Sequence, residues 1–259
     1  MNILAIGDIV GERTVEYLRG TLWDYRRQNN ISMVIANGEN ASEISGIDAR
    51  MAKTLLDSGV DVITGGNHTL RRRDLYPLLE SSANVLRPAN YPPAVPGGGY
   101  TLADIDGVRV LVINVLGTVD MEPLDSPFSC VEKILERENG RYDISVLDVH
   151  AEATSEKLAM GRYFDGRINI VFGTHTHIQT ADETVLAGGT GYITDLGMSG
   201  PQNGILGVKT ECALKKFLTK MPVKFEVADG KIEIFGAIFN VDIGQRRVNT
   251  VRRVTFQAQ

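Results

Sequence analysis

Short apolar runs rich in β-branched residues alternate with segments of helical periodicity through about the first two-thirds of the chain. This alternation is typical of parallel strands joined by crossover helices, so the predicted fold class is α/β. The expected strands cover residues 2–6, 32–36, 60–64, 108–114, 144–149 and 168–172, and the expected helices lie around residues 15–25, 51–56, 74–79, 130–137 and 155–164.

Beyond Tyr192 the pattern changes to antiparallel strands, which we expect at residues 223–227, 232–239 and 247–256. Asp229-Gly230 predicts a hairpin between the first two of them. Proline and glycine are dense in residues 88–100, which indicates a structured surface loop. No segment resembles a linker and no repeat recurs at a fixed period, so residues 1–259 are expected to form a single domain.

The composition is that of a globular chain, with 43% hydrophobic and 23% charged residues. It argues against a disordered, collagen-like or coiled-coil protein. The 27 Lys and Arg against 32 Asp and Glu give a formal net charge of −5. Without a strongly basic half, binding to polymeric nucleic acid is not expected, whereas a small anion can bind where a metal supplies positive charge.

The two cysteines, Cys130 and Cys212, form no CxxC pair and no disulfide framework, which indicates a reducing compartment. The N-terminal MNILAIGDIV has no basic region and reaches Asp8 after a short apolar run. Such a run is too short for a signal or membrane-spanning segment. We therefore expect a cytoplasmic protein with no membrane partner.

All four histidines follow predicted strands and have other ligand-type residues beside them. In open α/β sheets, functional sites form at the carboxyl ends of strands, where loops from distant parts of the sequence converge. The candidate site residues are Asp8 after LAIG, Glu39 and Asn40 in NGEN, Asn67 and His68 in GGNH, His150 in LDVH, and His175 and His177 in GTHTH.

Each piece also has a purely structural explanation. Asp8 can cap the following helix, NGEN and GGNH can be turns, and His150 can be a hydrogen-bonded core residue. His175 and His177 are more specific, because residues i and i+2 of an extended segment face the same way. The joint pattern favours a metal site, since turns do not require carboxylates, amides and every histidine to gather at one sheet edge.

The donor types indicate which metals bind. Imidazoles, carboxylates and amide oxygens without thiolates suit iron, manganese, zinc or cobalt. The candidates exceed the ligands of one tetrahedral zinc site, so two adjacent ions bridged by a carboxylate and a water fit better. Asn67 and His68 are neighbours that point in opposite directions on an extended chain, so one can bind metal while the other acts on substrate.

The charge of such a site predicts its substrate. Two divalent ions, two carboxylates and a bridging hydroxide leave about one positive charge. This charge would attract a phosphodiester monoanion even though the whole chain is acidic.

The order and combination of the motifs GDIVG, NGEN, GGNH, HAEATSEK, GTHTHIQTAD and TDLGMSGP resemble the YmdB-type bacterial metallophosphoesterases, a branch of the calcineurin-like superfamily. The motifs run from Asp8 to Pro201. The resemblance implies one metallophosphoesterase domain folded as a four-layer α/β/β/α sandwich. It also implies a dinuclear metal centre, with iron expected first, and phosphodiesterase activity toward small cyclic nucleotides of the 2′,3′-cyclic class.

Carried over residue by residue, the resemblance assigns Asp8, Glu39, Asn40 and His177 to one ion and Glu39, Asn67, His150 and His175 to the other, with Glu39 bridging. His68 matches the general acid. The expected mechanism is attack on phosphorus by a metal-bridging hydroxide while His68 protonates the departing ribose oxygen.

The chain departs from the family motif after GGNH. The family continues with Thr-Trp-Asp, whereas this chain has TLRRR at residues 69–73, so Leu70 and Arg71 replace Trp and Asp. The arginines can assist anion capture or form a solvated face. Tyr91, in the loop of residues 88–100, can stack on a base or anchor the loop in the core.

Two other functions stay open. One is a metal-dependent hydrolase on a (β/α)₈ barrel, which also gathers histidines at strand ends but requires eight βα units. The other is a metal-dependent nucleotide-binding regulator with little turnover, which needs no general acid. The antiparallel C-terminal strands argue against the barrel, and the Asn67-His68 pair favours an enzyme. The sequence does not fix the base preference, the departing ribose oxygen or the oligomeric state, and a homo-oligomer is compatible with it.

Overall fold

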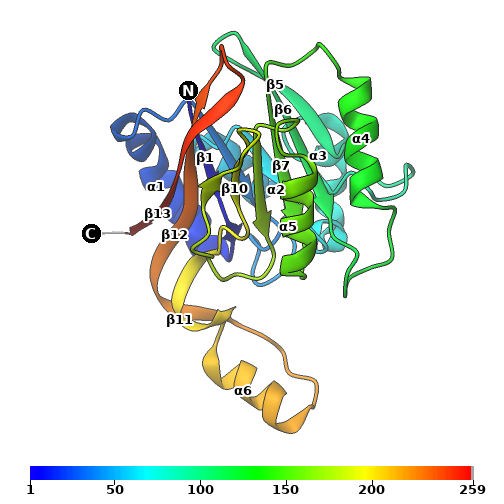
Figure 1. Ribbon diagram of the computed structural model, residues 1–259. Coiled ribbons are helices and arrows are strands. Elements are labelled where there is room, and N and C mark those ends of the chain that lie inside the picture. The colour runs from blue at the N-terminus through cyan, green and yellow to red at the C-terminus, as the bar shows by residue number, and fades with distance from the viewer. Residues whose placement is uncertain (258–259) are drawn as a thin grey trace.

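Two β-sheets packed face to face form the centre of the computed structural model, which describes residues 1–257 (Figure 1). The first sheet has the strand order β2-β11-β12-β1-β3-β4, with β13 paired to β12. Its strands are β1 (Asn2–Ile6), β2 (Asp8–Ile9), β3 (Met33–Asn37), β4 (Val62–Thr64), β11 (Met198–Val208), β12 (Val227–Asp242) and β13 (Arg247–Gln257). Strands β1, β3 and β4 are parallel, whereas β11, β12 and β13 pair antiparallel.

The second sheet has the strand order β5-β6-β7-β8-β10-β9. Its strands are β5 (Tyr100–Ile105), β6 (Val108–Leu116), β7 (Ile144–His150), β8 (Ile170–Thr174), β9 (Thr184–Val185) and β10 (Gly191–Ile193). Strands β6, β7, β8 and β10 are parallel neighbours. Both sheets therefore contain a run of parallel strands, as the alternation of strand and helix patterns predicts.

The helices form the outer layers. The first sheet is covered by α1 (Glu12–Gln28), α2 (Ala49–Asp57) and the short α3 (Tyr76–Ser81), which follows 3₁₀ turns at Thr69–Arg71 and Arg73–Leu75. The second sheet is covered by α4 (Pro127–Arg137) and α5 (Thr154–Tyr163), which pack on its outer face. Figure 1 shows α1 at the left of the molecule and α4 and α5 at the right.

Strand β1 shows why the layers stack in this order. Successive side chains of a strand point to opposite faces of the sheet. Leu4 and Ile6 pack in the cluster beneath α1 and α2, whereas Ile3 and Ala5 pack in the cluster between the two sheets. A strand buried on both faces has to be apolar throughout, which is the continuous pattern that the sequence shows. The predicted α/β/β/α sandwich is confirmed.

Helix α6 (Thr210–Thr219) lies apart from the body of the molecule (Figure 1). It connects β11 to β12, whose nearby ends pair at Val208 and Val227. Only Ala213 of α6 is buried, and Phe217 and Leu218 are exposed. The sequence pattern does not predict this helix.

The C-terminal region corrects two predictions. The expected strand at residues 223–227 is wrong, because those residues before Val227 are irregular. The expected Asp229-Gly230 hairpin is also wrong, because both residues lie inside β12. Gly230 has a φ of +103° and faces Asn203, where the β11–β12 register shifts, so the glycine permits a bulge in place of a turn. The hairpin lies further on, at residues 243–246.

Several other expectations are settled by the topology. The antiparallel C-terminal strands and the irregular segment at residues 88–99 are confirmed. The (β/α)₈ barrel is wrong, because the strands form two separate sheets. The sequence pattern predicts neither the short strands β2, β9 and β10 nor the longer β5 and β11. Among residues 1–257, no helix has the length and apolar character needed to cross a membrane.

Candidate metal centre

The predicted site residues come from both sheets and lie in one cluster of side chains. From the first sheet, Asp8 begins β2, Glu39 and Asn40 follow β3, and Asn67 and His68 follow β4. From the second sheet, His150 ends β7, and His175 and His177 follow β8. The site therefore forms where the carboxyl ends of strands from two face-to-face sheets converge.

Glu39 lies at the middle of the cluster and is 1% exposed. Its Oε1 is 3.2 Å from His150 Nε2, and its Oε2 accepts a hydrogen bond of 3.0 Å from the backbone N–H of His68. Asn40 Nδ2 donates to Glu39 Oε1 at 3.2 Å. A buried carboxylate with these neighbours can act as a metal ligand.

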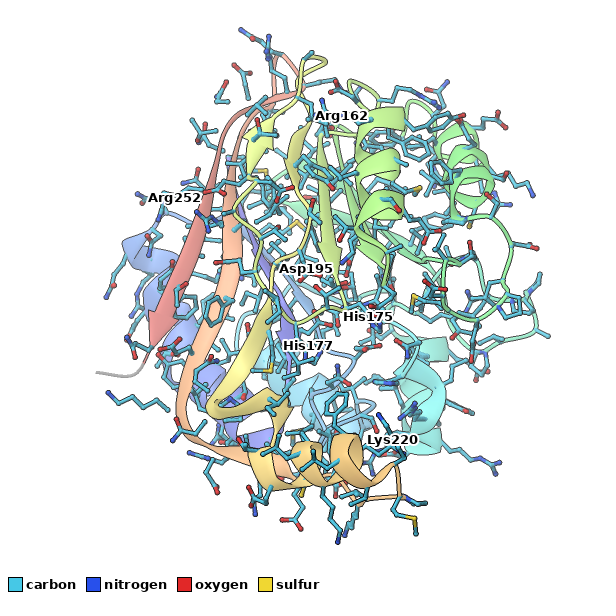
Figure 2. The ribbon with its side chains drawn as sticks, turned by 60° about the horizontal axis from the view of Figure 1, so that its bottom comes forward. Arg162, His175, His177, Asp195, Lys220 and Arg252 are labelled. Carbon is cyan, nitrogen blue, oxygen red and sulfur yellow. The ribbon has the colours of Figure 1, made fainter. Side chains whose placement is uncertain are left out.

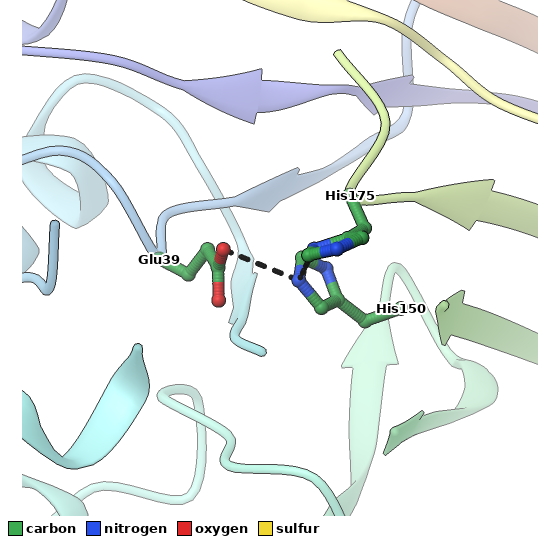
Figure 3. Close-up of side chains that lie close together, drawn as sticks. All are labelled: Glu39, His150 and His175. Carbon is green, nitrogen blue, oxygen red and sulfur yellow. Dashed lines mark hydrogen bonds and ion pairs between the residues drawn. The ribbon is translucent and has the colours of Figure 1, made fainter. Parts of the chain in front are cut away.

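His150 joins Glu39 to two further candidates. Its Nε2 is 3.2 Å from Asn67 Oδ1 and 3.1 Å from His175 Nδ1. Ligand atoms of Glu39, His150 and His175 all lie within 4.8 Å of one another, which is close enough to hold one metal ion. Figure 3 shows the Glu39 carboxylate facing the His150 ring, with His175 beside it.

The remaining candidates surround Asp8. His177 Nε2 is 3.3 Å from Asn40 Nδ2 and 3.9 Å from Asp8 Oδ1, and Asp8 Oδ2 accepts a hydrogen bond of 3.1 Å from the backbone N–H of His175. Within residues 1–257, the buried Asp8 Oδ1 has no hydrogen-bond partner. A buried anionic oxygen without a partner is costly, and a bound cation would satisfy it. The side chains therefore fit a metal site.

Gly66 provides room for this cluster. A Cβ atom at this position would overlap Glu39 Oε2 and the His150 ring. Any larger residue would push a candidate ligand out of place, which explains glycine in the GGNH motif.

His68 differs from the other histidines because it lies at the rim. Its Nδ1 is 2.8 Å from Asn40 Oδ1 and 3.4 Å from Glu39 Oε1, and its side chain is 21% exposed. Asn67 and His68 lie in a turn, so the expectation of an extended segment is wrong. Their side chains nevertheless reach different partners, His150 for Asn67 and Asn40 for His68.

The expectation that His175 and His177 lie on an extended segment is also wrong. Strand β8 ends at Thr174, and the two histidines have φ values of +99° and +64°. Positive φ is unfavourable for residues other than glycine, so the surrounding structure has to hold this loop. Both histidines reach the cluster from the loop, on different sides of it.

A buried ion pair, which the sequence pattern does not predict, holds the loop. Lys157 of α5 and Asp195 are both almost fully buried, and Lys157 Nζ is 2.7 Å from Asp195 Oδ2. Lys157 also donates to the Thr174 carbonyl at 3.0 Å, and Asp195 accepts hydrogen bonds from the backbone N–H and Oγ1 of Thr176. Figure 2 shows Asp195 next to His175 and His177. Lys157 lies in the motif HAEATSEK and Asp195 in TDLGMSGP. The only sign of the pair in the sequence is a charged residue among positions that are otherwise buried.

A second missed group orients His150. Its Nδ1 is 2.9 Å from Thr174 Oγ1, which in turn donates to Asp148 Oδ1 at 2.7 Å. Asp148 is fully buried and also accepts hydrogen bonds from Thr64 and Asn37. Such a chain fixes the ring so that Nε2 faces the cluster. The signal in the sequence is an aspartate inside the apolar strand β7.

The electrostatics follow from the burial of these groups. Burial raises the pKa of Asp8, and burial raises the pKa of Asp148 to about 6. Burial opposes charge on His150, but its ion pair with Glu39 outweighs this and raises the His150 pKa to about 9. Burial and repulsion from His150 lower the pKa of His175 to about 4.

A cavity of about 500 Å³ opens beside the cluster. Asn67 and His175 line it on the side of the cluster, together with Leu70, Arg71 and Tyr91. Leu70 and Arg71, which replace the family's Trp and Asp, therefore face the space that a substrate would enter. Tyr91 is half-buried and its hydroxyl is 3.3 Å from Glu122 Oε2, so it lines the cavity instead of anchoring the core.

Comparison with known proteins agrees with the motifs. The family model of the YmdB-like protein matches residues 4–254. The 2′,3′-cyclic-nucleotide 2′-phosphodiesterase of Bacillus subtilis is 40% identical over 254 residues, covering 98% of this chain and 96% of the relative.

Solved structures give the same result. The crystal structure of a hypothetical protein from Thermus thermophilus is similar with a TM-score of 0.94 and 39% identity, with 100% of both chains covered. A novel phosphatase of Mycoplasma pneumoniae has a TM-score of 0.93 and 27% identity over 99% of this chain and 93% of that one. The motifs, the two-sheet fold and these similarities together show that the chain belongs to the YmdB-like family of metallophosphoesterases.

Proposed function

We propose that this protein is a dinuclear-metal phosphodiesterase that hydrolyses small cyclic nucleotides of the 2′,3′-cyclic class. The observation that carries the proposal is the buried cluster of Glu39, His150 and His175, which opens through His175 onto a cavity of about 500 Å³. This volume lies within the range of small-molecule sites. The name of the Bacillus subtilis relative supports the same substrate class.

The proposed metal assignment is the one that the family resemblance implies, and the contacts in the cluster support it. Asp8, Glu39, Asn40 and His177 would hold one ion, and Glu39, Asn67, His150 and His175 the other. Iron is the first expectation, and manganese, zinc and cobalt also suit nitrogen and oxygen donors without thiolate. When bound, such ions lower the pKa of water and neutralise negative charge on a phosphate.

His68 is proposed as the general acid. The contact between its Nδ1 and Asn40 Oδ1 fixes the ring and leaves Nε2 to carry a proton to the departing ribose oxygen. An alkoxide is a poor leaving group, so this proton lowers the barrier. Burial lowers the pKa of His68, while the negative charge of Glu39 supports the protonated form. Asn67 and His175, two of the proposed ligands, line the cavity, so a phosphate in it would lie next to the second ion.

The surroundings of the site indicate a small substrate. The chain has a net charge of −5, and Asp120 and Glu122 line the cavity, so a long polyanion would be repelled. We therefore expect long RNA and DNA to be poor substrates. We further propose that residues 1–259 act as one metallophosphoesterase domain and that the protein works in the cytoplasm, where its two free cysteines stay reduced.

The test is a substrate panel with the metal-loaded chain. We expect rapid hydrolysis of 2′,3′-cyclic nucleotides and much slower cleavage of long RNA. The variant His150→Ala should lose activity, because it lacks a central candidate ligand. Binding of cyclic nucleotides without turnover would instead identify a nucleotide-binding regulator. Efficient cleavage of long RNA in competition with cyclic mononucleotides would refute the proposed substrate class.

A further inference from the structure

A second cavity, of about 600 Å³, lies between the 88–100 loop and α4. Arg87, Tyr100, Cys130 and Lys133 are among its lining residues, and it shares Tyr91 with the cavity of the candidate metal centre. Its volume is also within the range of small-molecule sites. The proposed phosphodiesterase reaction makes no use of this cavity.

The strongest feature of this cavity is a buried cation. Arg87 is only 6% exposed. Its Nη1 donates to the Pro88 carbonyl at 2.7 Å, but its buried Nε has no hydrogen-bond partner in the part of the chain that the structure describes. A guanidinium remains charged in proteins, and a buried charge with a free donor is costly unless an anion pairs with it. Arg87 forms no ion pair among residues 1–257, so its charge favours an anion in the cavity that it lines.

Other groups add positive potential to the same cavity. Lys133 and Arg137 lie one turn apart on α4 and line it, and neither forms an ion pair among residues 1–257. Ser126, which also lines the cavity, caps the N-terminus of α4, an 11-residue helix. Ser126 Oγ already accepts the Ser129 N–H and Pro127 has no N–H, so the helix contributes mainly the partial positive charge of its N-terminus, which favours phosphate groups. Asp125 is the one carboxylate among the lining residues described, so cations outnumber it.

The cavity also has aromatic walls. Tyr100 is held by a hydrogen bond of 2.9 Å from its hydroxyl to Glu138 Oε1, and Tyr91 forms the wall shared with the first cavity. Fixed tyrosine rings provide faces on which a base can stack. We propose that this cavity binds a nucleoside monophosphate, with the phosphate held by Arg87, Lys133 and the N-terminus of α4. This inference does not depend on the proposed phosphodiesterase activity.

The two cysteines provide a direct test. Cys130 lines the cavity, whereas Cys212 lies on α6, and both are free and half-buried. The metal-loaded full chain would be treated with N-ethylmaleimide, a neutral reagent, with and without adenosine monophosphate at matched ionic strength. Mass spectrometry of the peptides then reports each cysteine separately. A ligand at about ten times its dissociation constant should slow modification of Cys130 roughly tenfold and leave Cys212 unchanged.

Variants localise the binding. Lys133→Glu should abolish the protection, while Lys53→Glu, which inverts an exposed lysine on α2, should retain it. Arg87→Met should also abolish the protection. Arg87 is buried, so this variant can fail to fold; Lys133→Glu changes an exposed residue and then provides the test by itself. Burial raises and Lys133 lowers the pKa of Cys130, so each variant is compared only with itself, with and without ligand.

Three results would overturn the proposal. The first is unchanged modification of Cys130 at saturating adenosine monophosphate. The second is protection that persists in Lys133→Glu but disappears in His150→Ala, which would place the ligand at the metal centre. The third is equal protection by inorganic phosphate and by adenosine monophosphate, which would show that the tyrosines bind no base.

Discussion

His68 and His150 have different surroundings, and this difference predicts different roles. His150 is fully buried and contacts Glu39, Asn67 and His175 through Nε2. His68 is partly exposed and hydrogen-bonds Asn40 through Nδ1. An imidazole inside the cluster is suited to hold metal, whereas one at its rim is suited to transfer a proton.

Substitution of His68 tests this division. His68→Ala should leave the bound metal unchanged and lower kcat for a cyclic nucleotide by roughly 10²- to 10⁴-fold, the usual contribution of general acid catalysis. The loss should be much smaller for a nitrophenyl phosphodiester, because a nitrophenolate departs without a proton.

His150→Ala is the matched variant and should lower metal content before any other property. The assignment of His68 as the acid fails if His68→Ala empties the site, or if it slows activated and unactivated esters equally.

The position of Arg71 decides between the two roles that the sequence leaves open for it, anion capture and a solvated face. It could have been a solvated arginine, but it lines the cavity beside the cluster. We expect Arg71→Ala to raise KM for a cyclic nucleotide roughly tenfold, because a charge-assisted hydrogen bond to phosphate is lost, with kcat and metal content unchanged. Arg73 is exposed and lies outside the cavity lining, so Arg73→Ala is the control. Equal KM values for both variants would show that Arg71 does not bind the substrate.

At the scale of elements, the loop after β8 depends on α5 and on the segment before β11. Lys157 and Asp195 fix the backbone around His175 and His177, which have positive φ. Removing one partner of a buried pair costs about 3–5 kcal/mol of stability, which would obscure an effect on the site. A milder change to the same network separates the two effects.

Thr176→Val is that change. It removes the hydrogen bond of 2.8 Å from Thr176 Oγ1 to Asp195 Oδ2. The ion pair between Asp195 and Lys157 stays intact, so no buried charge is left unpaired. We expect metal affinity, measured by titration, to fall by roughly tenfold or more, as for other groups that orient ligands. The melting temperature of the metal-free chain should change little. Thr184→Val, at an exposed position of β9, should alter neither property; unchanged metal affinity in Thr176→Val would remove the positioning role of Asp195.

The elements also show how far the sequence alone can predict this fold. Strands such as β1 and β7 are continuous apolar runs buried on both faces, so their pattern is unambiguous. Strand β11 contains MSGPQNGILGV, in which glycine and proline hide a strand that forms by pairing with β12. The Asp229-Gly230 signal misleads because the same residue types suit a bulge and a turn.

The same limit applies to the site. Residue types and strand ends were sufficient to name a cluster that the structure brings together. The conformation of the His175–His177 loop was not predictable, because Lys157 and Asp195 that hold it come from separate parts of the chain. Local periodicity carries no information about such a long-range ion pair.

At the scale of the whole molecule, the two sheets divide the site between them. Asp8, Glu39 and Asn67 come from the first sheet, and His150 and His175 from the second. The face-to-face packing of the sheets therefore sets the distance between the two groups of candidate ligands. The proposed dinuclear centre at this junction would explain how a chain with a net charge of −5 attracts a small phosphodiester.

Metal stoichiometry, followed together with activity, is the most direct measurement of the central claim. The protein would be stripped of metal with a chelator and then titrated with metal. At each step, elemental analysis gives the number of ions per chain, and the rate of hydrolysis of a 2′,3′-cyclic nucleotide is measured. We predict about two ions per chain, with the full rate reached only as the second ion binds. Full activity at about one ion per chain, or in the presence of excess chelator, would contradict a dinuclear phosphodiesterase.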